Sequence, residues 1–298
     1  MITRKLVYVM SLEELRQNIR RLCIEIREYD ESKKPIIKIP EGATGSAAGL
    51  PFESWFKNEM SGRMTKYKVF GRIEFIKYVI QNFLKNRGLD ELHEITWWAR
   101  LQQFSAENVR RIQIGEEPKL QQALGDIVIK YGDDLNDIVL INVKATEVSD
   151  GKPVGRPPNI VSAFRLLEFF LEIFEEKPHL ADKVNTWLVG FYYNPIGNGR
   201  VRIVNCHFIN MFKLDLEKAP EINFDAAIQI QWHVGDMIER EDQTLEMFAQ
   251  KLADKYWTEW KAFTKRRDEK LEGIIQSLMS AIKKARTQKR VSNFYYAR

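Results

Sequence analysis

The chain has 298 residues, of which 44% are hydrophobic and 29% charged, with a formal net charge of +5. This composition indicates a globular protein built as one large domain, or as one domain with an appendage. No apolar run reaches transmembrane length and the first residues turn polar too soon for a signal peptide, so we expect a cytoplasmic protein with no membrane partner. The two cysteines, Cys23 and Cys206, are far apart in the sequence, so the chain has neither a disulfide framework nor a CxxC zinc site.

The first hundred residues are predicted to be mainly helical. Apolar residues recur with helical spacing over 11–29, and Ser11 stands at the capping position. Pro and Gly punctuate residues 35–49, which we expect to form a loop. Three further helices are expected, at 52–60, 72–86 and 89–103.

The segment 125–146 carries the strongest chemical signal. It predicts two strands joined by a polar turn, with Asp126 near the start of the first and Asn142-Val143-Lys144 in the second. Side chains alternate along a strand, so residues 142 and 144 face the same way, about 7 Å apart. Many metal-dependent nucleases hold Mg²⁺ against a phosphodiester with an acidic residue followed by a strand bearing (Asp/Glu)-X-Lys. In such a site Lys144 would orient a metal-bound water or help to deprotonate it. The alternative is a pair of solvated residues at a sheet edge.

The second half of the chain predicts strands among helices. A helix is expected at 159–176, strands at 185–193 and 200–208 around the turn NPIGNG, and another strand at 226–234. The remainder is mainly helical. These elements predict an α/β fold with a mixed central sheet flanked by helices and a long helical C-terminal region.

The positive charge is concentrated near the C-terminus. Residues 1–240 carry 33 basic and 33 acidic side chains, whereas residues 241–298 carry 13 and 8. We therefore divide the chain into a core at 1–240, which includes the N-terminal helices, and a basic helical region at 241–298 packed on the same domain. The basic helix suits contacts with DNA phosphates, and a solvated helix face is the alternative.

Five stretches, in this order, resemble type II restriction endonucleases of the HincII family in the PD-(D/E)XK superfamily. They are ATGSAAGLPFESWF (43–56), GDIVIK, INVKATE, RPPNIVSAFRLLEFF (156–170) and INFDAAIQIQWHV (222–234). The resemblance covers about half of the chain. It implies a restriction-endonuclease-like fold and a prokaryotic, Mg²⁺-dependent homodimer that cuts a palindromic site in double-stranded DNA.

The resemblance also assigns residues of the metal site. Asp126 matches the first metal-binding aspartate and Lys144 the catalytic lysine, while the backbone carbonyl of Val143 is expected to complete the metal shell. Asn142 stands where the family has its second metal-binding aspartate. The loss of that charge is expected to weaken Mg²⁺ binding.

The DNA-reading residues follow in the same way. Asn159 and Asn223 match asparagines that contact bases, which suggests shared outer base pairs in a GT..AC-like site. Arg156 replaces a glutamine that wedges into the DNA stack, and Ser46 replaces a histidine, so the central pairs or the DNA distortion are expected to differ. The alternative for each asparagine is that it only caps a helix or a turn.

Three explanations of Asn142 are open at this point. It is an introduced substitution that impairs catalysis and keeps DNA intact, or a natural residue compensated by Glu168 or Glu53, or the mark of a protein that binds DNA without cutting it. The last explanation gives the alternative function, a DNA-binding protein of the same fold with a defunct metal site. An unrelated α/β protein is the third possibility.

Overall fold

The computed structural model of the chain describes residues 2–41, 46–85, 87–120, 123–155, 157–218, 221–224 and 228–295, with the side chains of 2–11, 46, 221 and 281–295 outside the description. Its helices are α1 (Ile2–Glu28), α2 (Ser46–Arg63), α3 (Arg72–Asn82), α4 (Leu89–Ile95), α5 (Ala106–Gln113), α6 (Ala163–Glu176) and α7 (Leu245–Tyr295), with 3-10 turns η1 (Pro178–Lys183), η2 (Met211–Lys213) and η3 (Val234–Asp236). Its strands are β1 (Ile36–Lys38), β2 (Lys68–Gly71), β3 (Ile127–Lys130), β4 (Ile138–Ser149), β5 (Lys152–Pro153), β6 (Asn159–Ser162), β7 (Thr186–Gly197), β8 (Arg200–Asn210), β9 (Glu221–Asn223) and β10 (Gln229–Gln231).

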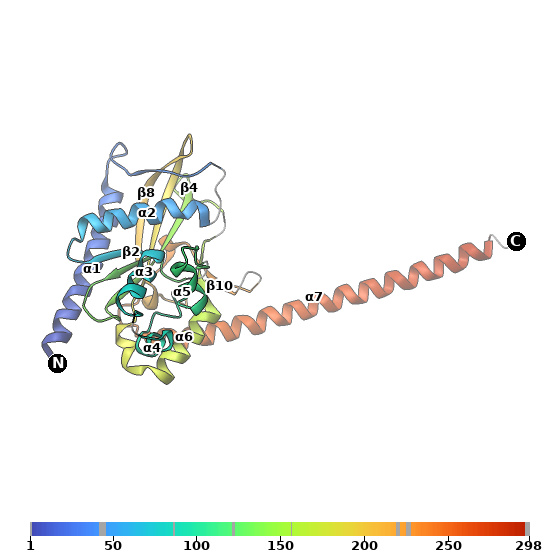
Figure 1. The fold of residues 1–298 in the computed structure, drawn as a ribbon. Coiled ribbons are helices and arrows are strands. Elements are labelled where there is room, and N and C mark those ends of the chain that lie inside the picture. The colour runs from blue at the N-terminus through green and yellow to red at the C-terminus, as the bar shows by residue number, and fades with distance from the viewer. Residues whose placement is uncertain are drawn as a thin grey trace. The chain divides into compact units, whose positions relative to one another are not determined.

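The central sheet is mixed, as the sequence predicts. Its strands run in the order β1-β8-β7-β4-β3-β2, and β5 pairs with β4. Figure 1 labels β8, β4 and β2 of this sheet. Only the β4–β7 pair in this order is parallel. A parallel pair needs a crossover connection, and α6 lies within it. A separate three-stranded sheet has the order β6-β10-β9.

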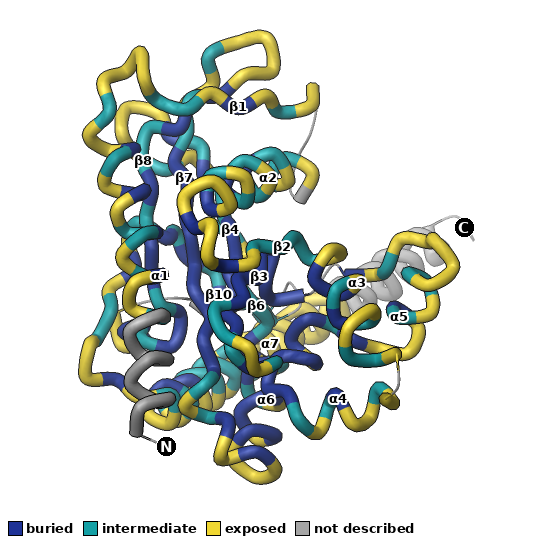
Figure 2. The backbone as a smooth tube through the Cα atoms, turned by 60° about the vertical axis from the view of Figure 1, so that its left-hand side comes forward, coloured by how far each residue is buried: buried dark blue, intermediate teal, exposed yellow. Residues whose placement is uncertain are grey.

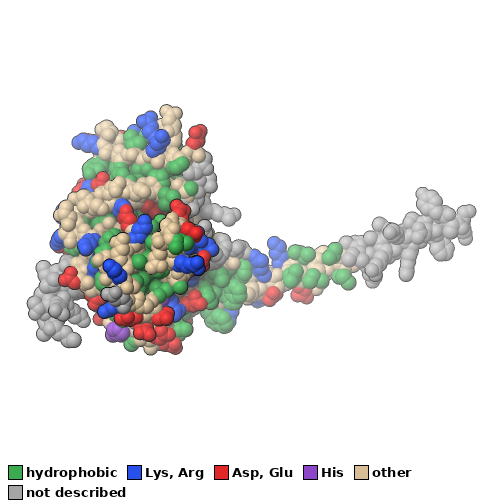
Figure 3. All heavy atoms as spheres, in the orientation of Figure 1, with side chains coloured by type: hydrophobic (Ala, Val, Ile, Leu, Met, Phe, Trp, Pro, Cys, Tyr) green, Lys and Arg blue, Asp and Glu red, His purple; other side chains and the backbone are tan. Residues whose placement is uncertain are grey.

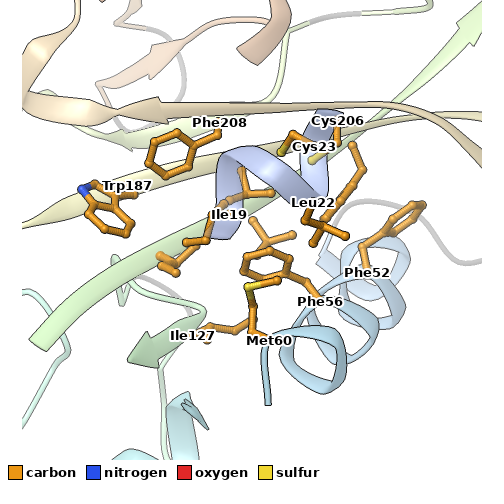
Figure 4. Close-up of a cluster of buried hydrophobic side chains, with 14 of the residues drawn as sticks. Ile19, Leu22, Cys23, Phe52, Phe56, Met60, Ile127, Trp187, Cys206 and Phe208 are labelled. Atoms are coloured by element: carbon orange, nitrogen blue, oxygen red, sulfur yellow. The ribbon is translucent and has the colours of Figure 1, made fainter. Parts of the chain in front are cut away.

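One face of the central sheet is covered by α1 and α2. The odd-numbered apolar residues of β3, β4 and β7 join one buried cluster with side chains of both helices, because alternate residues of a strand face the same side. Figure 2 shows the buried backbone of β4 and β7 beside α2, and Figure 4 shows Phe52, Phe56 and Met60 of α2 close to Ile19 and Leu22 of α1. This packing fixes where α2 meets the strands that carry the predicted site.

Three predicted helices are shorter than the sequence pattern indicates. The helix expected over 72–86 ends at Asn82. Residues 159–176 begin with strand β6, because Asn159–Ser162 pairs with β10, and α6 starts only after Ser162 caps it by accepting a hydrogen bond from the N–H of Arg165. The helix expected over 89–103 ends at Ile95. Beyond it the backbone N–H of Trp97 donates to the side chain of Asn136 in the loop before β4, in place of a helical bond, and the indole N–H of Trp98 donates to Leu135 of the same loop.

Other elements lack a strong local pattern. The loop expected at 35–49 contains β1, which pairs with β8 and buries Ile37, and α2 begins at Ser46 rather than at residue 52. Strands β2 and β9 are short and were not predicted. Residues 226 and 227 of the strand expected at 226–234 lie outside the described residues, and of residues 228–234 only those of β10 form a strand. Strands β1, β2 and β10 each pair with a segment that is distant in the sequence, whereas β9 pairs with the nearby β10.

Two compact units divide the chain, residues 1–252 and residues 253–298. In the first unit, Phe248 and Leu252 at the start of α7 are fully buried, and the Phe248 ring packs against Phe170 and Phe212. The second unit is the remainder of α7 and the end of the chain, so the C-terminal region is helical as predicted. Among the described helices, none is long and apolar enough to cross a membrane.

Candidate active site

Asp126 lies immediately before β3, where the pairing of β3 with β4 ends. The ladder runs from Lys130 opposite Ile138 to Ile127 opposite Ile141. The Asp126 carboxylate is buried, with 6% of its side chain exposed, and its Oδ2 accepts a hydrogen bond from the N–H of Val143 at 2.7 Å. The carboxylate thus satisfies a backbone donor of β4 that β3 no longer reaches.

A second carboxylate and an arginine meet Asp126 at this edge. One guanidinium nitrogen of Arg72, Nη2, lies 3.1 Å from Oδ1 of Asp126 and 3.1 Å from Oε2 of Glu53. Arg72 is the first residue of α3, directly after Gly71, which pairs with Ile127 in the β2–β3 ladder. Strand pairing therefore sets Arg72 beside Asp126, and α2 supplies Glu53.

The neighbouring charges and burial change the pKa of Glu53. Burial, followed by the neighbouring Asp126 carboxylate, raises the pKa of Glu53 above its ordinary value. The positive charges of Arg72 and Lys144 act in the opposite direction and only partly offset that rise. Lys144 therefore lies close enough for its charge to act on Glu53. Within the described ranges no hydrogen bond or ion pair engages the Lys144 ammonium, which stays half-buried.

Asn142 is almost completely buried, with 3% exposure, two residues before Lys144 on β4. Its Nδ2 donates to the carbonyl oxygens of Leu124, at 2.7 Å, and Ile160, at 3.3 Å. Its Oδ1 has no hydrogen-bond partner among the described residues. The amide thus ties β4 to the segment before Asp126 and to β6, and leaves one buried oxygen for a further partner.

Glu53, Arg72 and Asp126 line one cleft of about 780 Å³. The same cleft holds Lys57 and Glu74, whose charged groups pair at 2.6 Å. On the face drawn in Figure 3, basic and acidic side chains are likewise mixed over the core unit. Glu168, the other carboxylate considered as a compensator, is exposed and lines a different cavity of about 480 Å³. The structure therefore places Glu53, and not Glu168, beside Asp126.

The two predicted base-reading asparagines lie on the three-stranded sheet. Asn159 of β6 is opposite Gln231 of β10, and Asn223 of β9 is opposite Gln229. Directly opposed residues share a face, so the four amides line one side of this sheet. Gln231 Nε2 donates to Asn159 Oδ1 at 2.6 Å, and Gln229 Oε1 has no described partner.

Sequence reasoning missed three residues that the structure brings beside the predicted metal ligands and the predicted base-reading asparagines. Gln229 and Gln231 belong to a stretch that resembles the family, yet their pairing with Asn159 and Asn223 follows only from strand register. Arg72 belongs to no sequence motif, because it reaches Asp126 only through the pairing of β2 with β3. Arg156 and the side chain of Ser46 lie outside the described residues.

The oxygen atoms around Asp126 are of the kind that binds a hard divalent cation. Among the described residues no three Asp, Glu, His or Cys side chains gather as a metal site. The donors close to one another are the two carboxylates of Asp126 and Glu53, and the buried Oδ1 of Asn142 is unsatisfied. Mg²⁺ prefers oxygen ligands and keeps several waters, so a small set of protein oxygens is sufficient.

Three comparisons with known proteins give different results, and the family is shown by the match to a family model. A solved structure of the NlaIV restriction endonuclease is similar over 79% of this chain and 78% of its own, at 12% identity and a TM-score of 0.40. No curated protein matches the chain. The family model of restriction endonuclease HincII matches residues 32–285. This match spans well over half of the chain, so the chain belongs to the HincII family of restriction endonucleases, which are type II site-specific deoxyribonucleases.

Proposed function

We propose that this endonuclease cuts double-stranded DNA with Mg²⁺ held by Asp126 and Glu53, and with Lys144 beside them. The observation that carries the proposal is the meeting of the two carboxylates, 3.1 Å each from one guanidinium nitrogen, at the edge of the strand that bears Lys144. In this reading Glu53 supplies the charge that Asn142 lacks. The carbonyl oxygen of Val143 lies on the same edge as its N–H, because both backbone groups of a strand residue point to one side, and it would be a further ligand.

A bound Mg²⁺ would activate water and neutralise charge that develops on the phosphate. The chain's own groups position the reactants. Asp126 is held in place by the N–H of Val143, so its other oxygen, which meets Arg72, is fixed relative to β4. Lys144 is free of ion pairs in the described structure, and its ammonium would hold the attacking water and favour loss of its proton.

The buried amide supports Asn142 as a natural, compensated residue. Its Nδ2 faces two backbone carbonyl oxygens, an arrangement that suits an amide and not a carboxylate. An impaired, introduced Asn142 and a defunct metal site remain as outcomes of the experiment below.

Recognition would come from the polar side of the three-stranded sheet. Asn159 and Asn223 both donate and accept hydrogen bonds, so they can distinguish base edges in a groove, and we assign them the outer pairs of a GT..AC-like palindrome. Arg156 and Ser46 are assigned to the central pairs or to the DNA distortion. A homodimer would place one active site on each strand of such a target, as part of a restriction-modification system in a prokaryotic cytoplasm.

The proposal is tested by incubating the protein with plasmid DNA in Mg²⁺ or in EDTA and sequencing the ends. We expect double-strand breaks only with Mg²⁺, and all at one palindromic sequence. Salt-sensitive DNA binding without cuts, in the parent and in Asn142→Asp, would contradict the proposal and establish a binding protein. Cuts in Asn142→Asp alone would establish an impaired Asn142 form.

A further inference from the structure

Arg72 is placed as a cation between the two proposed metal ligands. Its Nη2 donates to both oxygens of Glu53, at 3.1 and 3.3 Å, and forms an ion pair with Oδ1 of Asp126 at 3.1 Å. The side chains are 22%, 16% and 6% exposed for Arg72, Glu53 and Asp126. Two partly buried carboxylates repel each other, and this guanidinium reduces the repulsion.

The position of Arg72 is built into the fold. Its backbone is fixed where β2 passes into α3, and its Nη1 lies 3.4 Å from the carbonyl oxygen of Leu120. The carboxylate oxygens that face Arg72 are the same oxygens that a metal ion would take from Glu53 and Asp126. The guanidinium and a divalent cation cannot both occupy the space between them, so binding of one requires displacement of the other.

A displaced arginine in this cleft has an obvious acceptor. The planar guanidinium matches phosphate oxygens with paired hydrogen bonds and keeps its charge at all relevant pH values. DNA that brings a phosphate to Asp126 also brings it to Arg72, which contacts Asp126 directly.

We propose that Arg72 occupies the cation position of the metal-free site, competes with Mg²⁺ for Asp126 and Glu53, and passes to a DNA phosphate when the metal binds. This inference rests on the proposed function, because it takes the two carboxylates as metal ligands. It adds a consequence, which is that metal and DNA help each other to bind. DNA stabilises the displaced arginine, and linkage requires the effect to be reciprocal.

The test measures metal binding and cleavage separately. Ca²⁺ affinity without DNA is measured by calorimetry for the parent, Arg72→Gln and Lys57→Gln, and single-turnover cleavage is then measured at saturating Mg²⁺. Lys57→Gln is the matched control, since Lys57 lines the same cleft and pairs with Glu74. Arg72→Gln is expected to bind Ca²⁺ about tenfold more tightly, because it removes a charge-assisted competitor, and to cleave at least about a hundredfold more slowly. Lys57→Gln should change Ca²⁺ affinity less than about threefold.

Opposite changes in the two measurements distinguish this role from a structural one. A merely structural arginine would lower both metal affinity and cleavage when replaced, and that result, or an unchanged Ca²⁺ affinity, would overturn the inference. Arg72→Lys keeps a charge but not the paired donors, so it should show intermediate values even if Arg72→Gln folds poorly. If the parent binds Ca²⁺ but never cuts DNA, the proposed function fails, whereas the competition is still judged by the Ca²⁺ affinities.

Discussion

Oδ2 of Asp126 accepts a hydrogen bond from the backbone N–H of Val143 at 2.7 Å, which joins the start of β3 to the strand that carries Lys144. One oxygen of the carboxylate is thus used to hold its place in the sheet, and the other meets Arg72. The structural and chemical roles of Asp126 can therefore be separated by substitution.

Asp126→Asn and Asp126→Ala should differ in stability but agree in activity. An amide oxygen can still accept from Val143, whereas alanine leaves that buried N–H without a partner, so Ala should lower the free energy of unfolding by about 1–3 kcal/mol more than Asn. Both variants lose the anionic ligand, and cleavage in Mg²⁺ should fall roughly a thousandfold, since the metal contributes several kcal/mol. Urea denaturation and single-turnover cleavage measure the two effects. Equal stability of the variants would contradict the role of the Asp126–Val143 bond.

Asn142→Asp should destabilise the protein without activating it. The new carboxylate would face the carbonyl oxygens of Leu124 and Ile160 and could not donate to them, so we expect a loss of about 1–3 kcal/mol in EDTA. With Glu53 already present, the cleavage rate should change less than about tenfold. Thermal unfolding and plasmid cleavage provide the measurements. A hundredfold gain in cleavage would show instead that Asn142 impairs the site.

The central strands could be predicted from the sequence because their side-chain pattern is local. Side chains alternate between the two faces of any strand, so Asn142 and Lys144 could be placed on one face of β4, opposite to the face of Val139, Ile141 and Val143 in the buried cluster. Asn159 was expected at a helix start, and the structure puts it in β6, because pairing with β10 overrides the helical pattern that follows. Arg72 could not be predicted at all. It meets Asp126 only because the pairing of β2 with β3 brings residues 54 positions apart in the sequence to one edge.

Asn159→Ala and Asn223→Ala should each weaken binding to the correct site by about 1–3 kcal/mol and leave binding to random DNA nearly unchanged. The reason is that base contacts discriminate sequence, whereas phosphate contacts do not. Equilibrium binding in Ca²⁺ measures both affinities, and Asn82→Ala, at the end of α3, is the control. Equal losses on both DNAs would leave the asparagines with a structural role only.

Stability should fall in mild acid because of His207. Burial, with the charge of Arg27 second, lowers the pKa of His207 from its ordinary value of 6.5. The folded protein therefore binds this proton less readily than the unfolded chain. The contribution of neutral His207 to the free energy of unfolding is fully present above about pH 6.5, the pKa in the unfolded chain. It is lost as the pH falls through the lower pKa of the folded protein.

Urea denaturation at several pH values between 7.5 and 5 should show this loss in the parent, and a smaller loss in His207→Gln. His179→Gln changes an exposed histidine and is the control. If the pH dependence of His207→Gln equals that of the parent, another group is responsible.

The central claim is that Glu53 replaces the acidic ligand that Asn142 does not provide. Single-turnover cleavage by Glu53→Gln in saturating Mg²⁺ tests it most directly, with Glu168→Gln as the matched control from the separate cavity. The account predicts that Glu53→Gln cuts roughly a thousandfold more slowly than the parent while Glu168→Gln cuts within about threefold of it. Normal cleavage by Glu53→Gln together with loss of cleavage in Glu168→Gln would contradict it.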